Sequence, residues 1–493
     1  MKGFSMKEYL KEIDSVICRG PYQDTWDSLS AIQIPGWFAQ AKFGIFIHWG
    51  LYSLAAHENE WYSRNMYIQE KEEWDYHRKT FGPHTEFGYK DFIPLFQAEK
   101  FDPYEWAQLF AQAGAKYIMS VAEHHDGFQM YDSAVSQWNT VRMGPHRDIL
   151  GELKAACKKE GLRFCTSSHR AEHWFFMSHG REFDSDIKEP LVRGDFYWPA
   201  MPEPEHQDLQ SMPYPSEEFL QDWLVRTCEL AKKYEPQLLY FDWWIEHEAF
   251  KPYLKKAAAY YYNLSADKGM CTAICYKHDA MMWGSGIAEI ERGSFRDAKP
   301  YVWQTDTAIA KNSWCYTDTL DYKDAGEIIR MLVDIVSKNG NLLLNIGPKG
   351  DGSIPDTDKK ILGQIGAWLK IHGEAIYGSH VWRVSGEGPT ETAEGQFTDL
   401  CAPKYQENDF RFTAKGGCIY VFAMQYPEHG QITVRSLAKS EDQNQPKFHG
   451  LVEDVAVLGN ERPPEWSVDQ IGLHVKMQIP DRRFPVALRV RVK

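Results

Sequence analysis

The chain of 493 residues lacks several features that would indicate whole classes of protein. It has no uninterrupted apolar segment long enough to span a membrane, no internal repeat and no low-complexity segment. It also lacks a basic surplus, since its formal net charge is −14. Binding to phosphate groups needs a basic face, so we expect neither a nucleic-acid partner nor a membrane partner.

Paired cysteines are absent as well. The nine cysteines are odd in number and scattered, and none forms a CxxC pair. Residues 1–16 carry charged side chains throughout and contain no apolar signal core. These features predict buried free thiols in a reducing compartment, and therefore a cytoplasmic protein without a signal peptide.

Aromatic residues, by contrast, are abundant. They make up 14% of the chain, and 18 of them are tryptophan. Indole rings often line clefts that bind sugars, because their faces cover apolar C–H surfaces while their N–H groups donate hydrogen bonds.

The first three quarters of the chain alternate between strand-like and helix-like segments. Short apolar runs at 43–47, 117–121, 163–167, 238–241, 271–275 and 342–346 are interleaved with helical patterns at 104–113, 150–160, 216–234, 251–264 and 325–338. Such alternation predicts a parallel sheet, and eight units of this kind close into a (β/α)8-like barrel. Not all eight units can be counted from the pattern.

The composition changes after Gly378. Short alternating segments such as 411–413, 418–422 and 486–492 are separated by Gly, Pro, Asn and Asp. This pattern is typical of an antiparallel β-sandwich. We therefore predict a catalytic (β/α)8-like barrel over 1–378 and a C-terminal β-sandwich domain over 379–493 that carries no catalytic residue.

Asp242 is the first candidate for a catalytic residue. It directly follows the apolar run 238–241, which contains Tyr240 and is predicted to be buried on both faces. An acid at the carboxyl end of a barrel strand lies where catalytic groups are placed, and burying an unpaired charge there is costly without a purpose. The alternative is that Asp242 caps the helix that follows.

Further polar and aromatic clusters follow other predicted strands. They contain His48 with Trp49, Glu60 with Trp61, His124 with His125, and His169 with Trp174. Histidine and tryptophan N–H groups can donate to hydroxyls while the rings cover C–H surfaces, which suits a monosaccharide.

A metal site is a weaker interpretation of these histidines. Adjacent residues of a strand, such as His124 and His125, point to opposite faces, and the chain has no HxH pair at these strand ends. We therefore expect no metal and no other cofactor.

Glycoside hydrolysis would need a second carboxylate beside Asp242. The segment 286–293 offers Glu289 and Glu291, which share one side if the segment is extended. The alternative is a surface ion-pair cluster that includes Arg292.

Several long motifs together resemble the α-L-fucosidases of glycoside hydrolase family 29. They span residues 42–50, 60–67, 124–128 and 333–348, followed by 350–352 and 354–355. The resemblance runs in order from about Trp37 to Trp382. It implies a catalytic barrel with a C-terminal β-sandwich and a retaining mechanism without a metal.

The resemblance also implies roles for individual residues. Asp242 matches the family's nucleophile, and Tyr240 matches an aromatic residue two positions before it. The positions that contact fucose match His48, Glu60, Trp61, His124, His125 and Trp314. The alignment of the acid/base favours Glu289, with Glu291 as the alternative.

The chain departs from the family pattern in three places. His169, in 167–169, stands near the position of a family tyrosine and is expected to take its role. Trp243 and Trp244 follow the nucleophile in place of smaller residues, and the family's arginine near the site has no clear match, with Lys277 as the nearest candidate.

The expected substrate is therefore a fucosylated oligosaccharide or glycoconjugate from which a terminal α-L-fucose is removed. Rival hypotheses are a glycosidase for a related sugar such as α-L-galactose, a non-catalytic sugar-binding protein, and a metallohydrolase. The sequence leaves the linkage and homo-oligomerisation open.

Overall fold

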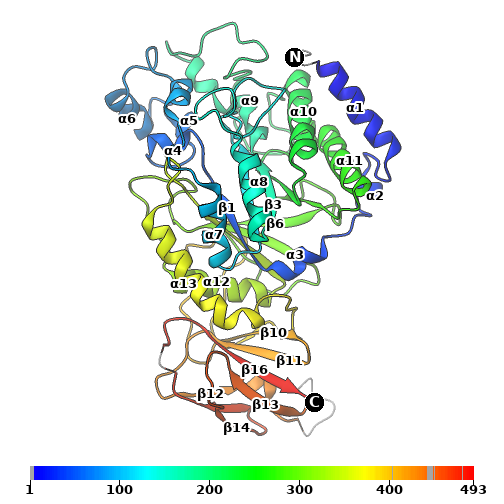
Figure 1. Ribbon diagram of the computed structural model, residues 1–493, viewed down its shortest axis with the longest axis vertical. Helices are drawn as coiled ribbons and strands as arrows, with labels where there is room; N and C mark the ends of the chain where they lie inside the picture. Colours follow the sequence, from blue (N-terminus) through cyan, green and yellow to red (C-terminus); the bar gives the residue numbers. More distant parts are fainter. Residues whose placement is uncertain (1–4, 402, 441–447, 449, 480) are drawn as a thin grey trace.

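The computed structural model describes residues 5–401, 403–440, 448, 450–479 and 481–493. Eight parallel strands form a closed barrel in sequence order (Figure 1). They are β1 Phe43–Ile47, β2 Tyr117–Glu123, β3 Arg163–Ser168, β4 Leu238–Phe241, β5 Ala273–Tyr276, β6 Ile287–Glu291, β7 Trp303–Ala308 and β8 Gly340–Ile346. The predicted barrel is confirmed, and the units that the sequence pattern did not resolve are those of β6 and β7.

Helices surround the barrel. The longer ones are α1 Met6–Arg19, α6 Glu72–Thr80, α7 Pro103–Gln112, α8 Ile149–Glu160, α10 Glu217–Tyr234, α11 Lys251–Asp267, α12 Ala325–Ser337 and α13 Asp356–His372. The short ones are α2 Trp26–Leu29, α3 Gly36–Ala41, α4 Tyr52–Ala55, α5 Tyr62–Asn65 and α9 His173–Phe176. Short polar caps fix several starts: the side chains of Asp102, Asp148, Ser216 and Asp324 accept backbone N–H groups of the first turn. None of the helices among the described residues combines the length and the apolar character needed to cross a membrane.

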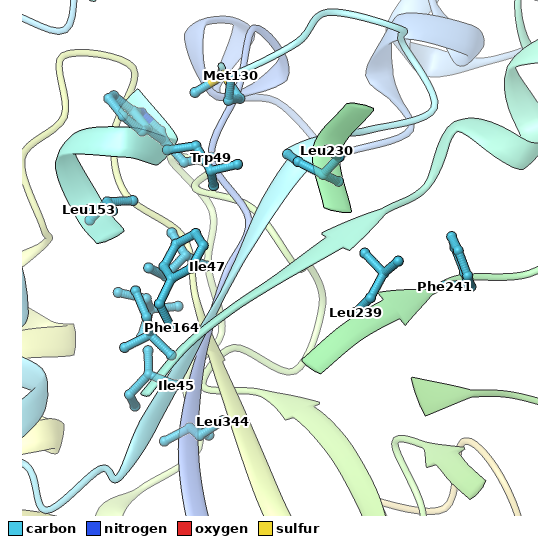
Figure 2. Close-up of a cluster of buried hydrophobic side chains, with 14 of the residues drawn as sticks. Ile45, Ile47, Trp49, Met130, Leu153, Phe164, Leu230, Leu239, Phe241 and Leu344 are labelled. Atoms are coloured by element: carbon cyan, nitrogen blue, oxygen red, sulfur yellow. The ribbon is translucent and has the colours of Figure 1, made fainter. Parts of the chain in front are cut away.

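Successive side chains of each barrel strand point alternately outward and inward, so they form an outer and an inner apolar layer. Figure 2 shows Ile45, Leu239 and Leu344 on strands in one cluster with Leu153 and Leu230 of the surrounding helices. A separate cluster contains the alternate strand residues, among them Phe46, Leu238, Tyr240, Ile287 and Leu343. Because both faces of the strands are buried, most of them read as continuous apolar runs, whereas β6 and β7 contain buried polar residues. The same period of two makes Asp242, after Leu238 and Tyr240, an inward-facing residue.

The C-terminal part contains two antiparallel sheets, which lie below α12 and α13 in Figure 1. Their strands are β9 Gly386–Glu387, β10 Phe410–Lys415, β11 Cys418–Ala423, β12 Gln431–Val434, β13 Val452–Val457, β14 Glu465–Val468, β15 Leu473–Lys476 and β16 Val486–Val492. The order is β13-β16-β11-β10-β9 in one sheet and β12-β15-β14 in the other, and a shared apolar core contains residues of both. The predicted β-sandwich is confirmed. The boundary at residue 378 stays a prediction, because part of the segment between β9 and β10 returns to the barrel.

A buried ion-pair cluster joins the barrel to the sandwich. The Asp334 carboxylate on α12 accepts from Lys338 Nζ at 2.6 Å and from Arg411 Nε of β10 at 2.6 Å. Burial alone would raise the pKa of Asp334, but Lys338 and Arg411 hold it below its usual value. Asp334 therefore stabilises the junction as a carboxylate.

We expect Asp334→Asn to reduce the free energy of unfolding by about 3–5 kcal/mol at pH 7, because it leaves two buried cations without their acceptor. A carboxylate with a lowered pKa stabilises the fold above the usual aspartate pKa of about 3.9, and this contribution disappears as the pH falls through the lowered value. The difference from wild type, measured by thermal unfolding, should be full at pH 7 and narrow below about pH 4. Glu428→Gln, which removes the exposed partner of Arg482, is the control and should change stability by less than about 0.5 kcal/mol. An equal effect of the two variants would contradict the role of Asp334.

Candidate active site

A cavity of about 340 Å³ lies beyond the carboxyl ends of the barrel strands. Its walls consist of Phe46, His48, Glu60, Trp61, His124, His125, His169, Glu172, Gln207, Tyr240, Asp242, Trp243, Trp244, Lys277, Glu291, Asp306, Trp314 and Phe397. These residues come from loops and strand ends along most of the chain. Among the residues to which the family resemblance assigns a role, Glu289 alone is missing from these walls. Trp49 and Trp174, which the sequence placed in the polar and aromatic clusters, are buried and do not line the cavity either.

Asp242 stands at the end of β4 among hydrogen-bond donors. His169 Nδ1 donates to its Oδ2 at 2.9 Å, and Lys277 Nζ donates to its Oδ1 at 3.0 Å. Burial alone would raise the pKa of Asp242, but the charge of Lys277 and the His169 contact hold it well below its usual value. Asp242 is therefore an ionised carboxylate at the base of the cavity.

Three histidines beside it are neutral. Burial lowers the pKa of His125 to about 3 and lowers those of His48 and His124 well below the usual value. The Nδ1 atoms of His48 and His125 donate to the Asn345 side-chain oxygen at 2.6 Å and to the His169 carbonyl at 2.8 Å. Each of these two rings therefore presents Nε2 as an acceptor, and His124 Nδ1 has no hydrogen-bond partner among the described residues. Such a set can accept hydrogen bonds from several hydroxyl groups of one ligand.

The two glutamates of β6 lie at different depths of the barrel. Both face inward, but Glu289 is level with Gln304 and Glu291 is level with Asp306, nearer the carboxyl end. Glu291 lines the cavity, accepts from Trp243 Nε1 at 2.6 Å and binds Lys277 Nζ. Glu289 instead accepts from Gln304 Nε2 at 3.1 Å inside the barrel, and burial raises its pKa well above the usual value. The sequence ranked Glu289 before Glu291 as the acid/base, and of the two only Glu291 lines the cavity.

Comparisons with known proteins agree with this geometry. A sequence model of the family described as Alpha-L-fucosidase matches residues 10–374. The chain belongs to the α-L-fucosidase family.

Relatives and solved structures match over nearly the whole chain. The tissue alpha-L-fucosidase of Rattus norvegicus is 31% identical over 94% of this chain and 90% of its own length. The plasma alpha-L-fucosidase of Homo sapiens is 30% identical over 92% of this chain and 88% of its own length. The crystal structure of Thermotoga maritima alpha-fucosidase in complex with fucose is 30% identical, with a TM-score of 0.73, and the match covers 95% of this chain and all of that chain.

Residues far apart in the sequence form another part of the cavity wall in this family member. Glu60 Oε2 accepts from the Trp314 backbone N–H at 3.0 Å, and the Trp314 carbonyl accepts from Asn345 Nδ2 at 2.6 Å. Burial raises the pKa of Glu60. Trp61 packs edge-on against the His125 ring at 5.9 Å. The wall therefore combines a buried carboxyl group with two indole rings.

A metal site among the histidines conflicts with their hydrogen bonds. Ring nitrogens of His48, His124 and His169 come within 4.8 Å of one another, close enough to hold an ion. His169, however, uses Nδ1 to bind Asp242 and Nε2 to accept from Ser167 Oγ at 2.9 Å. An ion there would have to break one of these contacts.

Sequence reasoning missed three functional candidates and gave a fourth, Lys277, no clear role. Lys277, which the sequence marked only as the nearest match to the family's arginine, lies at the centre of the acidic groups. Asp306 stands on β7, which the pattern did not identify as a strand. Glu172 lies in the cluster after β3, and its Oε2 makes no hydrogen bond among the described residues. Phe397 comes from the segment after β9, and no local pattern marks it.

The contact between Lys277 and Asp242 predicts that replacing Lys277 changes the pH dependence of activity. We expect Lys277→Met to move the acid limb of kcat/KM for fucoside hydrolysis to higher pH by about one unit or more, because the pKa of Asp242 rises when the ammonium is removed. The measurement is the pH profile with an aryl α-L-fucoside. Lys338→Met removes an equally buried lysine that binds Asp334 outside the cavity, so it should lower stability and leave the limb in place. An unmoved limb in Lys277→Met would show that another group controls the ionisation of Asp242.

Proposed function

We propose that this protein is a retaining exo-α-L-fucosidase that removes terminal α-L-fucose from fucosylated glycans or glycosides by double displacement. Asp242 is the nucleophile and Glu291 is the acid/base. The observation that carries the proposal is that the same Lys277 ammonium binds both carboxylates. Two oxygens that each lie about 3 Å from one nitrogen are at most about 6 Å apart. This upper limit includes the separation of about 5–5.5 Å that retention needs and lies below the separation of about 6.5–9.5 Å that inversion needs.

In the first step an Asp242 oxygen attacks the anomeric carbon of the fucoside. The bond from this carbon to the leaving oxygen breaks, and Glu291 gives that oxygen its proton. In the second step Glu291 takes a proton from water, the water oxygen bonds to the anomeric carbon, and the ester bond to Asp242 breaks. Configuration is inverted twice and so retained.

The proton for the first step is available in the acidic cluster. Asp242, Glu291 and Asp306 surround the Lys277 ammonium, and one positive charge cannot balance three buried carboxylates. Burial raises the pKa of Asp306 to about 7 although Lys277 opposes the shift. Asp306 therefore holds a proton near neutral pH in the cluster that contains Glu291, the member that we place beside the leaving group.

The shape of the cavity and its hydrogen-bond acceptors support a single terminal sugar. Its volume of about 340 Å³ is near the lower end of the range for ligand sites, about 300–1,000 Å³. His48, His124 and His125 offer acceptors to the hydroxyls, and Trp61 and Trp314 offer apolar surface to the C6 methyl group. The structure of the Thermotoga maritima relative was determined with fucose. The cytoplasmic location stays a prediction.

We expect Asp242→Ala to fold normally and to lose at least about 10³-fold in kcat on an aryl α-L-fucoside, because it removes the covalent nucleophile. Azide should restore part of the turnover and give the inverted β-fucosyl azide, identified by NMR. A variant that keeps near-wild-type activity would show that Asp242 is not the nucleophile.

The two glutamates of β6 form a matched pair of variants. We expect Glu291→Ala to slow hydrolysis far more for poor leaving groups than for nitrophenol or fluoride, since only poor leaving groups need protonation. Azide should then give the retained α-fucosyl azide. Glu289→Ala should affect all leaving groups evenly, because its side chain does not line the cavity. If only Glu289→Ala showed the leaving-group dependence and gave the α-fucosyl azide, Glu289 and not Glu291 would be the acid/base.

A further inference from the structure

A segment that follows β9 in the sequence returns to the mouth of the catalytic cavity. We call residues 394–399 the return segment. The backbone N–H of Phe397 donates to the Glu291 carbonyl at 2.9 Å, and that of Asp399 donates to the Arg292 carbonyl at 2.8 Å. Ser294 and Gly395 add an antiparallel bridge. The return segment is thus bonded directly to the backbone of the proposed acid/base and of the residue after it.

Buried contacts hold the return segment in this place. The Asp399 carboxylate accepts from Arg292 Nη1 at 3.1 Å, from Thr307 Oγ1 at 2.6 Å and from Lys323 Nζ at 2.9 Å. Gly293 allows the close approach, because a Cβ atom at this position would lie 1.9 Å from the Gly395 carbonyl oxygen. Such anchoring predicts a fixed position for Phe397 in solution.

The fold gives Phe397 little burial and a strained backbone conformation. Its side chain is 57% exposed, and its backbone has a φ of 56°, in the left-handed region that a bulky residue adopts at a cost. Its ring lies nearly parallel to that of Trp243, with centroids 6.2 Å apart and planes at 12°. Both rings line the cavity. An exposed aromatic ring in a strained conformation at a cavity mouth indicates that a ligand covers it.

The hydrogen bond between Trp243 and Glu291 shows that the rings of Trp243 and Phe397 lie beside the proposed acid/base. Trp243 Nε1 donates to Glu291 Oε2 at 2.6 Å, and Glu291 protonates the leaving oxygen in the proposed function, on which this inference rests. The group attached to that oxygen therefore emerges beside Trp243 and Phe397. Aromatic faces carry partial negative charge and attract the C–H hydrogens of a sugar ring.

We propose that Phe397 and Trp243 form an aromatic platform for the sugar to which fucose is linked, and that the platform binds the apolar C–H face of a hexopyranose. The barrel supplies Trp243, and the return segment supplies Phe397. The platform thus acts on the leaving group and not on fucose.

The test compares two substrates of wild type, Phe397→Ala, Phe397→Tyr and Leu400→Ala. One is α-L-fucosyl fluoride, whose leaving group is too small to reach the platform. The other is the disaccharide that wild type cleaves best from a panel in which fucose is linked to galactose or N-acetylglucosamine. Leu400 is the matched control, because it is 58% exposed three residues further on and does not line the cavity.

We expect the ratio of kcat/KM for the disaccharide to that for the fluoride to fall about tenfold in Phe397→Ala, because stacking on the second sugar is lost. Phe397→Tyr, which keeps the ring, and Leu400→Ala should hold the ratio within about twofold of wild type. Thermal unfolding checks that all variants are folded.

A wild-type ratio in a folded Phe397→Ala variant would overturn the platform and leave the proposed function intact. An equal fall in Leu400→Ala would also overturn it, since the effect would then belong to the segment and not to the ring. If wild type cleaves neither the fluoride nor any fucoside, the proposed function fails and the platform fails with it.

Discussion

The ammonium group of Lys277 is the interaction on which the site depends. It is fully buried and lies 3.0 Å from Asp242, 3.9 Å from Asp306 and within bonding distance of Glu291. Without it, three carboxyl groups would share one buried space, and mutual repulsion would drive protons onto them. With it, Asp242 keeps its charge, while burial raises the pKa of the neighbouring Asp306 to about 7. One cation therefore lets two chemically similar carboxyl groups, Asp242 and Asp306, differ in pKa within one buried site.

The sequence predicted the parts of the site that follow local rules. An apolar run ending in an acid identified β4 and Asp242, because both faces of a barrel strand are buried and its carboxyl end faces the cavity. The histidine clusters after β1, β2 and β3 were found in the same way. In β7 the rule failed, because Gln304, Asp306 and Thr307 make the run polar although every residue of the strand is buried. Those polar side chains bind Glu289, Tyr240 and Asp399, partners that no local pattern shows.

The sequence pattern also could not predict how deep in the barrel a side chain lies. A period of two places Glu289 and Glu291 on one face and cannot tell which is nearer the cavity, because that depends on the register between β6 and β7. The position of Phe397 was also beyond prediction from a local pattern, because it depends on residues far away in the sequence. Its position depends on backbone bonds to residues about a hundred positions earlier and on the buried charge of Asp399.

These constraints divide the site into two parts with different origins. The barrel forms the histidine-lined base of the cavity. Each neutral ring and buried acid there contacts several other side chains, so few substitutions are tolerated. The return segment reaches the mouth through one charged anchor, Asp399, and a few backbone bonds. A substitution at Phe397 meets solvent and not the buried network, so it changes the leaving-group side at small cost to the fold. A cavity built in this way can keep one sugar at its base while the group beyond the scissile bond varies.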